Sequence, residues 1–470
     1  MPIPKSELLA TLPPEWPEDL LFWIRDAVRA SGRKLVVLDD DPTGTQTVHN
    51  VTVLTDASVK RLIAALRAPD PVVYVLTNTR SLPLAQAQAL NREIAHHLQA
   101  ARDTTGRKIA IVSRSDSTLR GHYPGETDAL ATALGDPFDA TVIVPFFVEG
   151  GRITAHDTHY VTEGDLLIPA SETEYARDAV FGYRHANLRA WVSEKHGERM
   201  ASAAVDSVSL DVIRRGGPPA VLKQLAALNP GQVCVVNAVS YRDLEVVVAA
   251  LMAAEAQGQR FLYRTAASFV RVRGGIAPQP LLTPADLRSD ASPAGGLIII
   301  GSHVSKTTQQ MVALQALPGV TGFEVAVADL INPHRQTPTV QALTTRVERT
   351  LQAGEDALVY TSRAALTTFG DLTGLEIGRR VSRGLTAIVA GLVTRPAWVI
   401  AKGGITASDV ATEALRIRRA EVMGQAIPGV PIWQTKEESR WPNLIYVVFP
   451  GNVGDSRALA RMVCLLRGET

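Results

Sequence analysis

The chain has 470 residues, of which 46% are hydrophobic and 20% are charged, and its formal net charge is +1. This composition is that of an ordinary globular protein and excludes an intrinsically disordered chain. The near-zero net charge gives no electrostatic reason to expect nucleic acid or an acidic membrane as a partner. At this length two domains are the default, because a single hydrophobic core stops growing at shorter lengths.

The only two cysteines, Cys234 and Cys464, each lie in an apolar run. This favours buried free thiols in a reducing compartment over a disulfide or zinc framework. The apolar run Leu20–Ile24 is too short for a signal peptide and follows acidic residues. No apolar run approaches the length of a membrane span. We therefore expect a cytoplasmic protein.

Short β-branched runs alternate with helical patterns from Lys34 onward, after a leading segment 1–33 that carries prolines and then a helical pattern. Between the first three runs lie helical patterns such as Val59–Leu66 and Ala85–Leu98. The expected strands are Lys34–Leu38, Val72–Leu76, Lys108–Val112 and Thr141–Val144. Such alternation predicts βαβ units and a mostly parallel sheet.

Each of these four strands runs into polar residues, and three of the ends carry an arginine. The four segments are Asp39–Gly44, Thr77–Arg80, Ser113–Glu126 and Glu149–Thr154. Ligands of open α/β sheets bind beyond the carboxyl ends of the strands. Guanidinium groups make bidentate bonds to carboxylate or phosphate. A solvated loop explains one such end, whereas four together favour a site for an anionic ligand.

The middle of the chain is less periodic. Residues 153–205 are expected to form an insertion or a lid, and alternation resumes at Gln232–Asn237 and Arg260–Tyr263. The stretch 274–296 is rich in proline and glycine and is typical of a linker. The predicted fold class is α/β, with two domains that each contain a mostly parallel sheet flanked by helices. The expected domains are residues 1–273 and 297–470.

Three strand–glycine–helix turns follow in the second domain, at Gly301-Ser302, at Gly403–Thr406 and at Gly451–Asp455. A helix N-terminus presents unpaired N–H groups, and glycine lets a phosphate approach the backbone. Each turn alone is common turn chemistry, but three together suggest a nucleotide or another phosphate ligand. Lys306 stands where a P-loop needs its second glycine, and the dinucleotide fingerprint is missing after the first strand, so neither standard motif is present.

Several polar residues have two readings. For His156 and His159 the sequence favours a surface or hydrogen-bonding role over metal binding, because a third metal ligand is missing. Lys402 could pair with phosphate or simply end a strand. Ser305 and Asp455 are plausible caps of the helices that follow them.

Four motifs match a known family: Asp40-Asp41-Pro42-Thr43-Gly44, Asp116-Ser117-Thr118-Leu119-Arg120-Gly121, Gly301-Ser302, and Lys402-Gly403-Gly404-Ile405-Thr406. From about Lys34 to the C-terminus the sequence resembles the four-carbon acid sugar kinases, long catalogued as a domain of unknown function. The resemblance implies an N-terminal domain that binds a sugar acid and a C-terminal domain that binds ATP. It further implies an active site in the interdomain cleft and a phosphorylated acid of the threonate, erythronate or oxo-tetronate type as the product.

The resemblance also implies site residues, position by position. The expected sugar-acid contacts, with Arg152 added from its strand end, are Asp40, Asp41, Arg80, Asp116, Ser117, Thr118, Leu119, Arg120 and Arg152. The expected nucleotide contacts are Ser302, Gly403, Gly404, Ile405, Thr406, Gly451, Asn452 and Gly454. Many members have an aspartate where this chain has Ile405. The last turn, Phe449–Gly454, lacks the lysine, serine and phenylalanine that are common there. Backbone contacts would survive both departures.

Phosphoryl transfer needs alignment, charge neutralisation and help in deprotonating the attacking hydroxyl. We expect Arg80 and Arg120 to clamp the substrate carboxylate, while Ser117 and Thr118 read its hydroxyls. Mg²⁺ is expected as a bridge between nucleotide phosphates, and no protein ligand is assigned to it.

Asp41 is the expected general base, because it lies at the end of the first strand. Asp116 is an alternative, and Asp455 is the choice if the base comes from the nucleotide side. Two other function classes stay open: a nucleotide-independent aldolase or isomerase of sugar acids, and a ligand sensor without catalysis. A homodimer is the base-rate expectation for the assembly.

Overall fold

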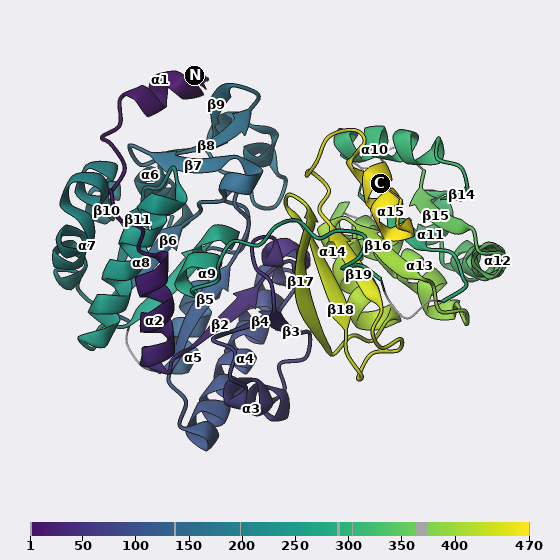
Figure 1. Cartoon of the computed structure of the whole chain (residues 1–470), viewed down its shortest axis with the longest axis horizontal. Helices are drawn as coiled ribbons and strands as arrows, with labels where there is room; N and C mark the ends of the chain where they lie inside the picture. Colours follow the sequence, from purple (N-terminus) through teal and green to yellow (C-terminus); the bar gives the residue numbers. More distant parts are fainter. Residues whose placement is uncertain are drawn as a thin grey trace. The chain divides into compact units, whose positions relative to one another are not determined.

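The computed structural model describes residues 2–135, 138–197, 199–288, 292–302, 304–362 and 374–469 (Figure 1). Contacts within the chain divide it into two compact units. Unit 1 contains Met1–Val48 and Asp56–Pro278, and unit 2 contains His49–Thr55 and Gln279–Thr470. Both units are α/β, as predicted. The interdomain cleft stays a prediction.

Unit 1 is built on a sheet in which every neighbouring pair of strands is parallel. In spatial order the strands are β10 (Asp206–Val208), β11 (Gln232–Val236), β6 (Ala140–Val144), β12 (Phe261–Thr265), β5 (Ile109–Arg114), β2 (Lys34–Asp39) and β4 (Val72–Leu76). β2 and β4 are buried along their whole length. Continuous runs of valine and leucine form such strands because helices cover both faces of a parallel sheet.

The helices of unit 1 form two packed groups (Figure 1). The first contains α2 (Leu21–Ser31), α7 (Leu210–Ala226), α8 (Tyr241–Ala256) and α9 (Ala267–Arg273). The second contains α3 (Val59–Arg67), α4 (Leu84–Thr105) and α5 (Gly125–Leu134). Of these, α4, α5, α7 and α8 connect consecutive strands of the parallel sheet in the βαβ manner that the sequence predicts.

The unassigned region 153–205 contains a small antiparallel sheet and helix α6 (Leu188–Lys195). The sheet joins β1 (Ile3–Pro4), β9 (Leu166–Pro169), β8 (Thr158–Glu163) and β7 (Arg152–Ala155), in that order. Side chains of this region share an apolar cluster with Leu119 and Tyr123, which follow β5. The insertion therefore packs directly on the segment that follows the third predicted strand.

Unit 2 has a mixed sheet. Its strands, in spatial order, are β3 (Val51–Leu54), β17 (Arg419–Ile427), β18 (Val430–Thr435), β19 (Ile445–Phe449), β16 (Trp398–Lys402), β13 (Leu297–Ile300), β15 (Asp356–Thr361) and β14 (Val320–Val325). Pairs from β3 to β19 are antiparallel, and pairs from β19 to β14 are parallel. The part that carries the three glycine turns is thus the parallel part.

Helices α10 (Ser305–Gln315) and α15 (Ala458–Arg467) pack together, as do α11 (Val327–Ile331), α12 (Pro333–Gln352) and α13 (Gly374–Gly391). One sequence expectation is wrong here. Ser305 is the first residue of α10 and Val304 occupies the N-cap position, without a side-chain cap bond. The helix after Gly403 is the short α14 (Gly404–Asp409), continued by a π-helical turn, Val410–Ala414.

The stretch expected as a linker packs in part on unit 2. Leu282 N donates to Gln425 O over 2.8 Å, and Leu282 and Leu287 are buried in the core of unit 2. Residues 289–291 of this stretch lie outside the described residues.

Cys234 is buried and Cys464 is half-buried, and both are free thiols. In the described part of the chain, every helix is too short or too polar to cross a membrane.

Candidate active site

Charged side chains from neighbouring strands meet at the carboxyl edge of the unit 1 sheet. β2 lies between β4 and β5, β5 also pairs with β12, and all of these pairs are parallel. Three aspartates, Asp39–Asp41, end or follow β2, and Arg80 lies in a short 3₁₀ turn, Thr79–Ser81, after β4. The sequence argument predicted this convergence, because the ends of parallel strands share one edge of a sheet.

Strand register explains two buried polar pairs at this edge. Asp39 and Arg114 are partners across β2 and β5, and Arg114 Nη1 donates to Asp39 Oδ1 over 3.0 Å. Ser113 and Arg264 are partners across β5 and β12, and Arg264 Nη1 donates to Ser113 Oγ over 2.7 Å. The same Nη1 lies 3.1 Å from Glu126 Oε2. These contacts hold the strand ends together below the polar surface.

Arg80 links three carboxylates. Its Nη2 lies 2.9 Å from Asp41 Oδ2 and 3.5 Å from Asp40 Oδ1, and its Nη1 lies 3.5 Å from Asp116 Oδ1. Asp116 Oδ2 in turn accepts from Arg120 Nε over 2.7 Å. The structure thus brings together the predicted catalytic residues Asp41, Asp116 and Arg120 in one row of alternating charge.

The innermost carboxylates have raised pKa values. Burial raises the pKa of Asp39 to about 7, although the Arg114 guanidinium opposes the shift. Burial also raises the pKa of Asp40 against the attraction of Arg80. Both side chains are at most 3% exposed, so removal from water outweighs their ion pairs.

The outer carboxylates behave in the opposite way. Burial disfavours the charged form of Asp41, but Arg80 and the hydrogen bonds from Thr43 hold its pKa below the ordinary value. Burial acts likewise on Asp116, where Arg120 and Arg80 hold the pKa far below the ordinary value. Asp41 and Asp116, with side chains 12% and 13% exposed, are therefore ionised acceptors at the surface of the site.

Two glycines let the backbone approach these side chains. Gly121 has φ +131°, and a Cβ there would lie 2.5 Å from Ser115 Oγ and 2.7 Å from Arg264 Nη2. A Cβ on Gly44 would lie 2.0 Å from Asp39 Oδ2. Larger residues at either position would displace the buried network.

The loop 116–121 is held from its other side by the insertion. His159 Nε2 donates to Ser117 O over 2.7 Å, and the Tyr183 hydroxyl donates to Thr118 O over 2.8 Å. Burial lowers the pKa of His159 to about 4, so its imidazole is neutral, and Nδ1 is bonded to the Thr154 hydroxyl at 2.9 Å. This is the hydrogen-bonding alternative that the sequence left open for the histidines.

Arg120 and Arg152 flank the ring of Tyr175. Their guanidinium carbons lie 5.0 Å and 5.8 Å from its centroid. Arg120 Nη1 also lies 3.6 Å from Asp178 Oδ2. Arg152 is buried, donates from Nη1 to Gly150 O, and has a buried Nε without a partner among the described residues.

The predicted contact Leu119 has a buried side chain that packs in the apolar cluster with Tyr123 and Trp191. Only its backbone is therefore suited to a polar ligand. Its φ of +67° is in the left-handed region, which bends the loop tightly between Thr118 and Arg120.

In unit 2, Ser302 lies among the three glycine turns. A Cβ on Gly403 would lie 3.2 Å from Ser302 Cβ, and a Cβ on Gly451 would lie 2.9 Å from Ser302 Oγ. Thr307 Oγ1 lies 3.1 Å from Ser302 Oγ and 3.1 Å from Gly451 O. Because β13, β16 and β19 are adjacent and parallel, their turns converge as the sequence predicts.

The other predicted nucleotide residues lie in the same turns. A Cβ on Gly301 would lie 2.1 Å from Thr406 Oγ1, so glycine is required beside α14. Ile405 is 37% exposed, and Asn452 O accepts from Lys306 Nζ over 3.3 Å. The remaining two are Gly404, the first residue of α14, and Gly454, with φ +82°.

Lys402 is fully buried at the end of β16. Its Nζ donates to Pro450 O over 2.8 Å and lies 4.2 Å from the centroid of the Phe449 ring. Burial lowers the pKa of Lys402 to about 7. The hydrogen bond from its amine to Pro450 O thus stabilises the last glycine turn.

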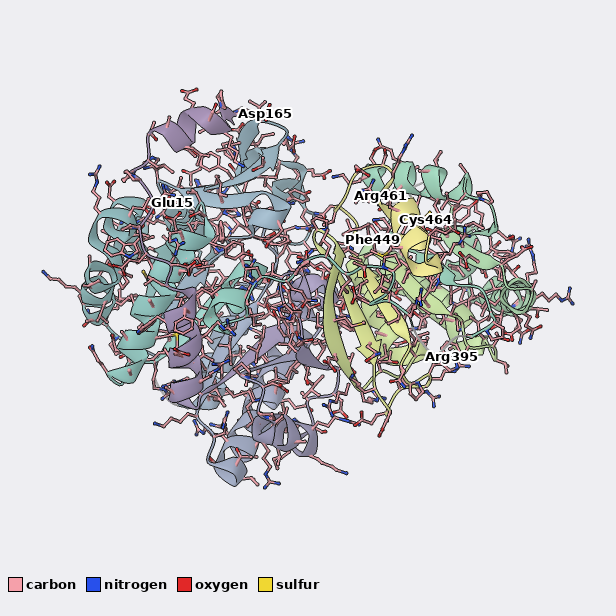
Figure 2. All side chains as sticks on the ribbon, in the orientation of Figure 1. Glu15, Asp165, Arg395, Phe449, Arg461 and Cys464 are labelled. Atoms are coloured by element: carbon pink, nitrogen blue, oxygen red, sulfur yellow. The ribbon has the colours of Figure 1, made fainter. Side chains whose placement is uncertain are left out.

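Asp455 lies before the N-cap position of α15, which Arg457 occupies. Its Oδ1 accepts from Arg457 N over 2.9 Å and lies 2.9 Å from Nη1 of Arg461, a residue labelled in Figure 2. It is exposed and bound to its own helix, which weakens its case as a general base.

In the described ranges, no group of three or more His, Cys, Asp or Glu side chains is arranged to hold a metal ion. The aspartates at the end of β2 are instead neutralised by arginines.

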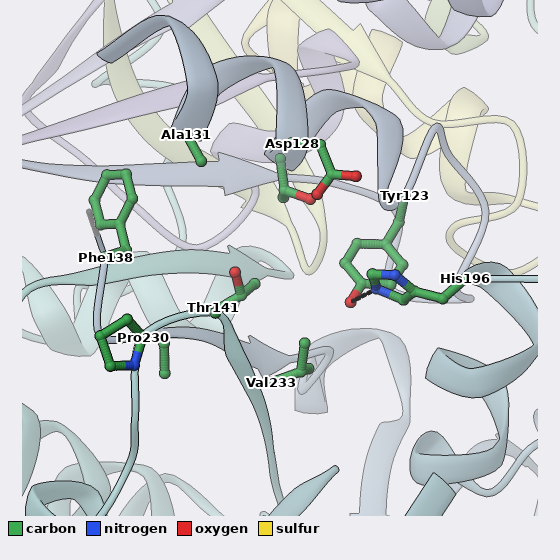
Figure 3. A pocket seen from close by; sticks show the side chains of 11 residues that line it. Tyr123, Asp128, Ala131, Phe138, Thr141, His196, Pro230 and Val233 are labelled. Carbon is green, nitrogen blue, oxygen red and sulfur yellow. Dashed lines mark hydrogen bonds between the residues drawn. The ribbon is translucent and has the colours of Figure 1, made fainter. Parts of the chain in front are cut away.

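A larger hollow of about 280 Å³ lies elsewhere in unit 1, at the amino ends of β6 and β11 (Figure 3). Tyr123, Asp128 and His196 are among its lining residues. Neither Asp41 nor Arg120 is among its lining residues.

Two family models together span most of the chain. Residues 35–273 match the sugar-binding N-terminal domain, and residues 297–459 match the nucleotide-binding C-terminal domain. The chain belongs to the four-carbon acid sugar kinase family.

Curated relatives of this family are similar over most of the chain. A D-threonate kinase of Bordetella bronchiseptica is 29% identical over 401 residues, 84% of this chain and 86% of the relative. A D-erythronate kinase of Heliobacterium modesticaldum is 26% identical, over 75% and 78% of the two chains. A 3-oxo-tetronate kinase of Burkholderia multivorans is 26% identical, over 86% and 92%.

Two solved structures share the fold. A Salmonella typhimurium LT2 protein superposes with a TM-score of 0.64 at 18% identity, covering 92% of this chain and 98% of the other. A Haemophilus influenzae protein superposes with a TM-score of 0.59 at 20% identity, covering 92% and 99%.

Sequence reasoning assigned no site role to several residues of the unit 1 network. Arg114 and Arg264 lie inside strands rather than after them, and Glu126 lies in the first turn of α5. An arginine at the end of an otherwise apolar strand is the signal that could have identified the first two. Tyr175 and Asp178 come from the insertion and carry no such signal.

Proposed function

We propose that this chain is a kinase that transfers a phosphoryl group from ATP to a hydroxyl of a four-carbon sugar acid. The observation that carries the proposal is the row Arg120–Asp116–Arg80–Asp41 at the carboxyl edge of unit 1. Its two guanidinium groups can bind the carboxylate of an acid, and its two ionised carboxylates can accept hydrogen bonds from hydroxyl groups. Relatives named as threonate, erythronate and 3-oxo-tetronate kinases support the same substrate class.

Arg120 and Arg152 are the proposed carboxylate clamp. The charge of Arg80 is already shared by three aspartates, so we assign it the role of holding Asp41 and Asp116 in position. Arg152 is buried, and no carboxylate of the described residues lies in ion-pair range of it. A buried guanidinium without a counter-ion is favourable only when an anion can reach it.

We propose that Ser117 and the two outer carboxylates, those of Asp41 and Asp116, form hydrogen bonds with the substrate hydroxyls. Thr118 is fully buried and bonds to Asp116, so we assign it the positioning of that carboxylate. Asp41 is the proposed general base, because its side chain is accessible and ionised, whereas Asp40 is 3% exposed. A base matters less than alignment in phosphoryl transfer, whose transition state is loose.

The proposed ATP site is the set of glycine turns around Ser302. The absence of Cβ atoms at Gly403 and Gly451 lets both turns approach Ser302, and glycine turns of this kind bind phosphate oxygens through backbone N–H groups elsewhere. Ile405 contributes no charge there, so backbone contacts carry the binding. Mg²⁺ would be held mainly by the nucleotide phosphates and water, which is its usual coordination beside a kinase substrate.

We further propose a cytoplasmic enzyme that acts without nucleic acid and assembles as a homodimer. Light scattering on the purified chain tests the assembly directly.

The function is tested by incubating the purified chain with ATP, Mg²⁺ and a panel of threonate, erythronate and their oxo relatives. At least one acid should drive ADP formation above the blank. ADP formation at the blank rate with every acid would argue against the proposal. Turnover of an acid without nucleotide would instead indicate an aldolase or isomerase, and stabilisation by an acid without turnover would indicate a sensor.

The clamp is tested with Arg120→Ala, which should lower kcat/KM for the best acid by about 100-fold, because a charge-assisted bidentate contact is lost. Arg215→Ala is the matched control, since Arg215 is exposed and pairs with Asp211 on its own helix. Full activity of Arg120→Ala would remove Arg120 from the clamp.

A further inference from the structure

A small cavity lies beneath the loop 116–121 in unit 1. Its volume is about 20 Å³, which is enough for one water molecule or one oxygen atom. Strand ends and the loop supply most of its wall, and α6 supplies one residue. The lining residues are Ser115, Asp116, Leu119, Arg120, Ile143, Pro145, Trp191, Arg264 and Thr265.

Two lining residues carry buried polar atoms that have no hydrogen-bond partner among the described residues: Thr265 Oγ1 and Trp191 Nε1. Both residues are 3% exposed. Buried donors are almost always paired in native structures, so two unpaired polar groups on the lining of one cavity need an explanation. An oxygen atom bound in the cavity would satisfy both.

The ring of Trp191 has a fixed position. It stacks on Tyr123, with centroids 4.9 Å apart and an angle of 17° between the rings. The Tyr123 hydroxyl is bonded to His196 Nε2 at 3.1 Å, and this contact is visible beside the larger hollow (Figure 3). The indole N–H is therefore preorganised.

Both of these unpaired groups, an indole N–H and a hydroxyl, can donate a hydrogen bond into the cavity. Ser115 Oγ is already bonded to Asp40 Oδ2, Arg120 O and Arg264 Nη2. Asp116 accepts from Arg120 and Thr118. The indole N–H can only donate, and Arg120 and Arg264 add positive charge. An acceptor oxygen with negative charge fits this lining best.

We propose that this cavity receives one carboxylate oxygen of the sugar acid, and that Trp191 and Thr265 donate hydrogen bonds to it. The inference rests on the proposed kinase function and adds two specificity-determining residues to it. Arg120 lines the cavity, so the same carboxylate can engage its guanidinium while one oxygen enters. The volume admits one oxygen atom and no further carbon, and the positive charge of Arg120 and Arg264 on the lining favours a carboxylate oxygen over a hydroxyl oxygen.

Thr265→Val removes the hydroxyl with little change in shape, and Trp191→Phe removes the N–H and keeps an aromatic ring against Tyr123. Each should raise KM for the acid about 10- to 100-fold, since a site built to bond an oxygen loses affinity when the donor is removed. KM for ATP should stay unchanged. Thr265→Ser keeps the hydroxyl and should retain most of the affinity, which separates the contact from a folding defect.

Thr386→Val is the matched control, because Thr386 Oγ1 is also buried and has no partner in the described part of the chain, but lies in unit 2. A second readout is the thermal shift produced by the acid and by the corresponding four-carbon polyol, which lacks the carboxylate. The variants should lose the shift from the acid and keep any shift from the polyol.

If the wild-type chain phosphorylates an acid and both variants keep KM within twofold, the cavity holds only water and the inference is wrong. Equal weakening of acid and polyol binding would also overturn it. If no acid is a substrate or a ligand of the wild-type chain, the proposed function itself fails, which is a different result.

Discussion

The buried amine of Lys402 gives the sharpest prediction for stability. It is fully buried at the end of β16, where it donates to one carbonyl, Pro450 O, and lies over the Phe449 ring. Lys306 is the charged group that acts on it, and its charge is of the same sign. Lys402→Met keeps a chain of similar shape and removes the ionisable group, so its effect on stability should depend on pH.

The sign follows from the lowered pKa. Unfolded lysine holds its proton up to about pH 10.5, whereas folded Lys402 releases it above about pH 7. Between these values the unfolded state binds more protons, so the stability of the wild-type chain rises with pH. From about pH 6.5 to about pH 9.5 this single group should contribute on the order of 3 kcal/mol to the rise.

The assay is urea unfolding of wild type and Lys402→Met at several pH values in this window. The free energy of unfolding of the variant should exceed that of wild type near pH 6.5, and this difference should shrink toward pH 9.5. Lys34→Met is the comparison in unit 1, because burial lowers the pKa of Lys34 only to about 8, so its gap should be smaller. A gap for Lys402→Met that stays constant or widens with pH would refute the reasoning.

Two further predictions concern glycines. Gly121→Ala should destabilise the chain by about 1–3 kcal/mol and abolish acid binding, because the new Cβ would meet Ser115 Oγ at 2.5 Å; urea unfolding and acid titration check this. Gly106→Ala, also at positive φ but with open space around it, is the control and should leave acid binding intact. Gly301→Ala should abolish ADP binding in calorimetry and leave acid binding unchanged, since its Cβ would meet Thr406 Oγ1 at 2.1 Å. Normal ADP affinity in that variant would contradict the assigned turn.

The strand ends could be predicted because the evidence for them is local. Apolar runs show where strands end, and parallel strands bring their ends to one edge, which brought Asp41, Arg80, Asp116 and Arg120 together. The run assigned to Lys108–Val112 continues to Arg114 as β5. The error arose because a terminal polar residue breaks the apolar pattern before the strand ends.

Long-range partners could not be predicted. Arg264 contacts Ser113 because the two residues are in register on neighbouring strands, and Glu126 contacts Arg264 from α5. Neither contact can be recognised from the local sequence. The same holds for β3, whose four residues pair with β17 in unit 2 although they lie early in the chain. His159 and Tyr183 support the loop 116–121 from an insertion without periodicity.

The central claim is phosphoryl transfer to a four-carbon acid. It is tested most directly by phosphorus NMR of a reaction that contains the purified chain, ATP, Mg²⁺ and the most active acid of the panel. The account predicts a new phosphomonoester signal that grows in step with ADP and disappears in the Arg120→Ala variant. ATP consumption that yields only inorganic phosphate, with no ester of any acid, would contradict it.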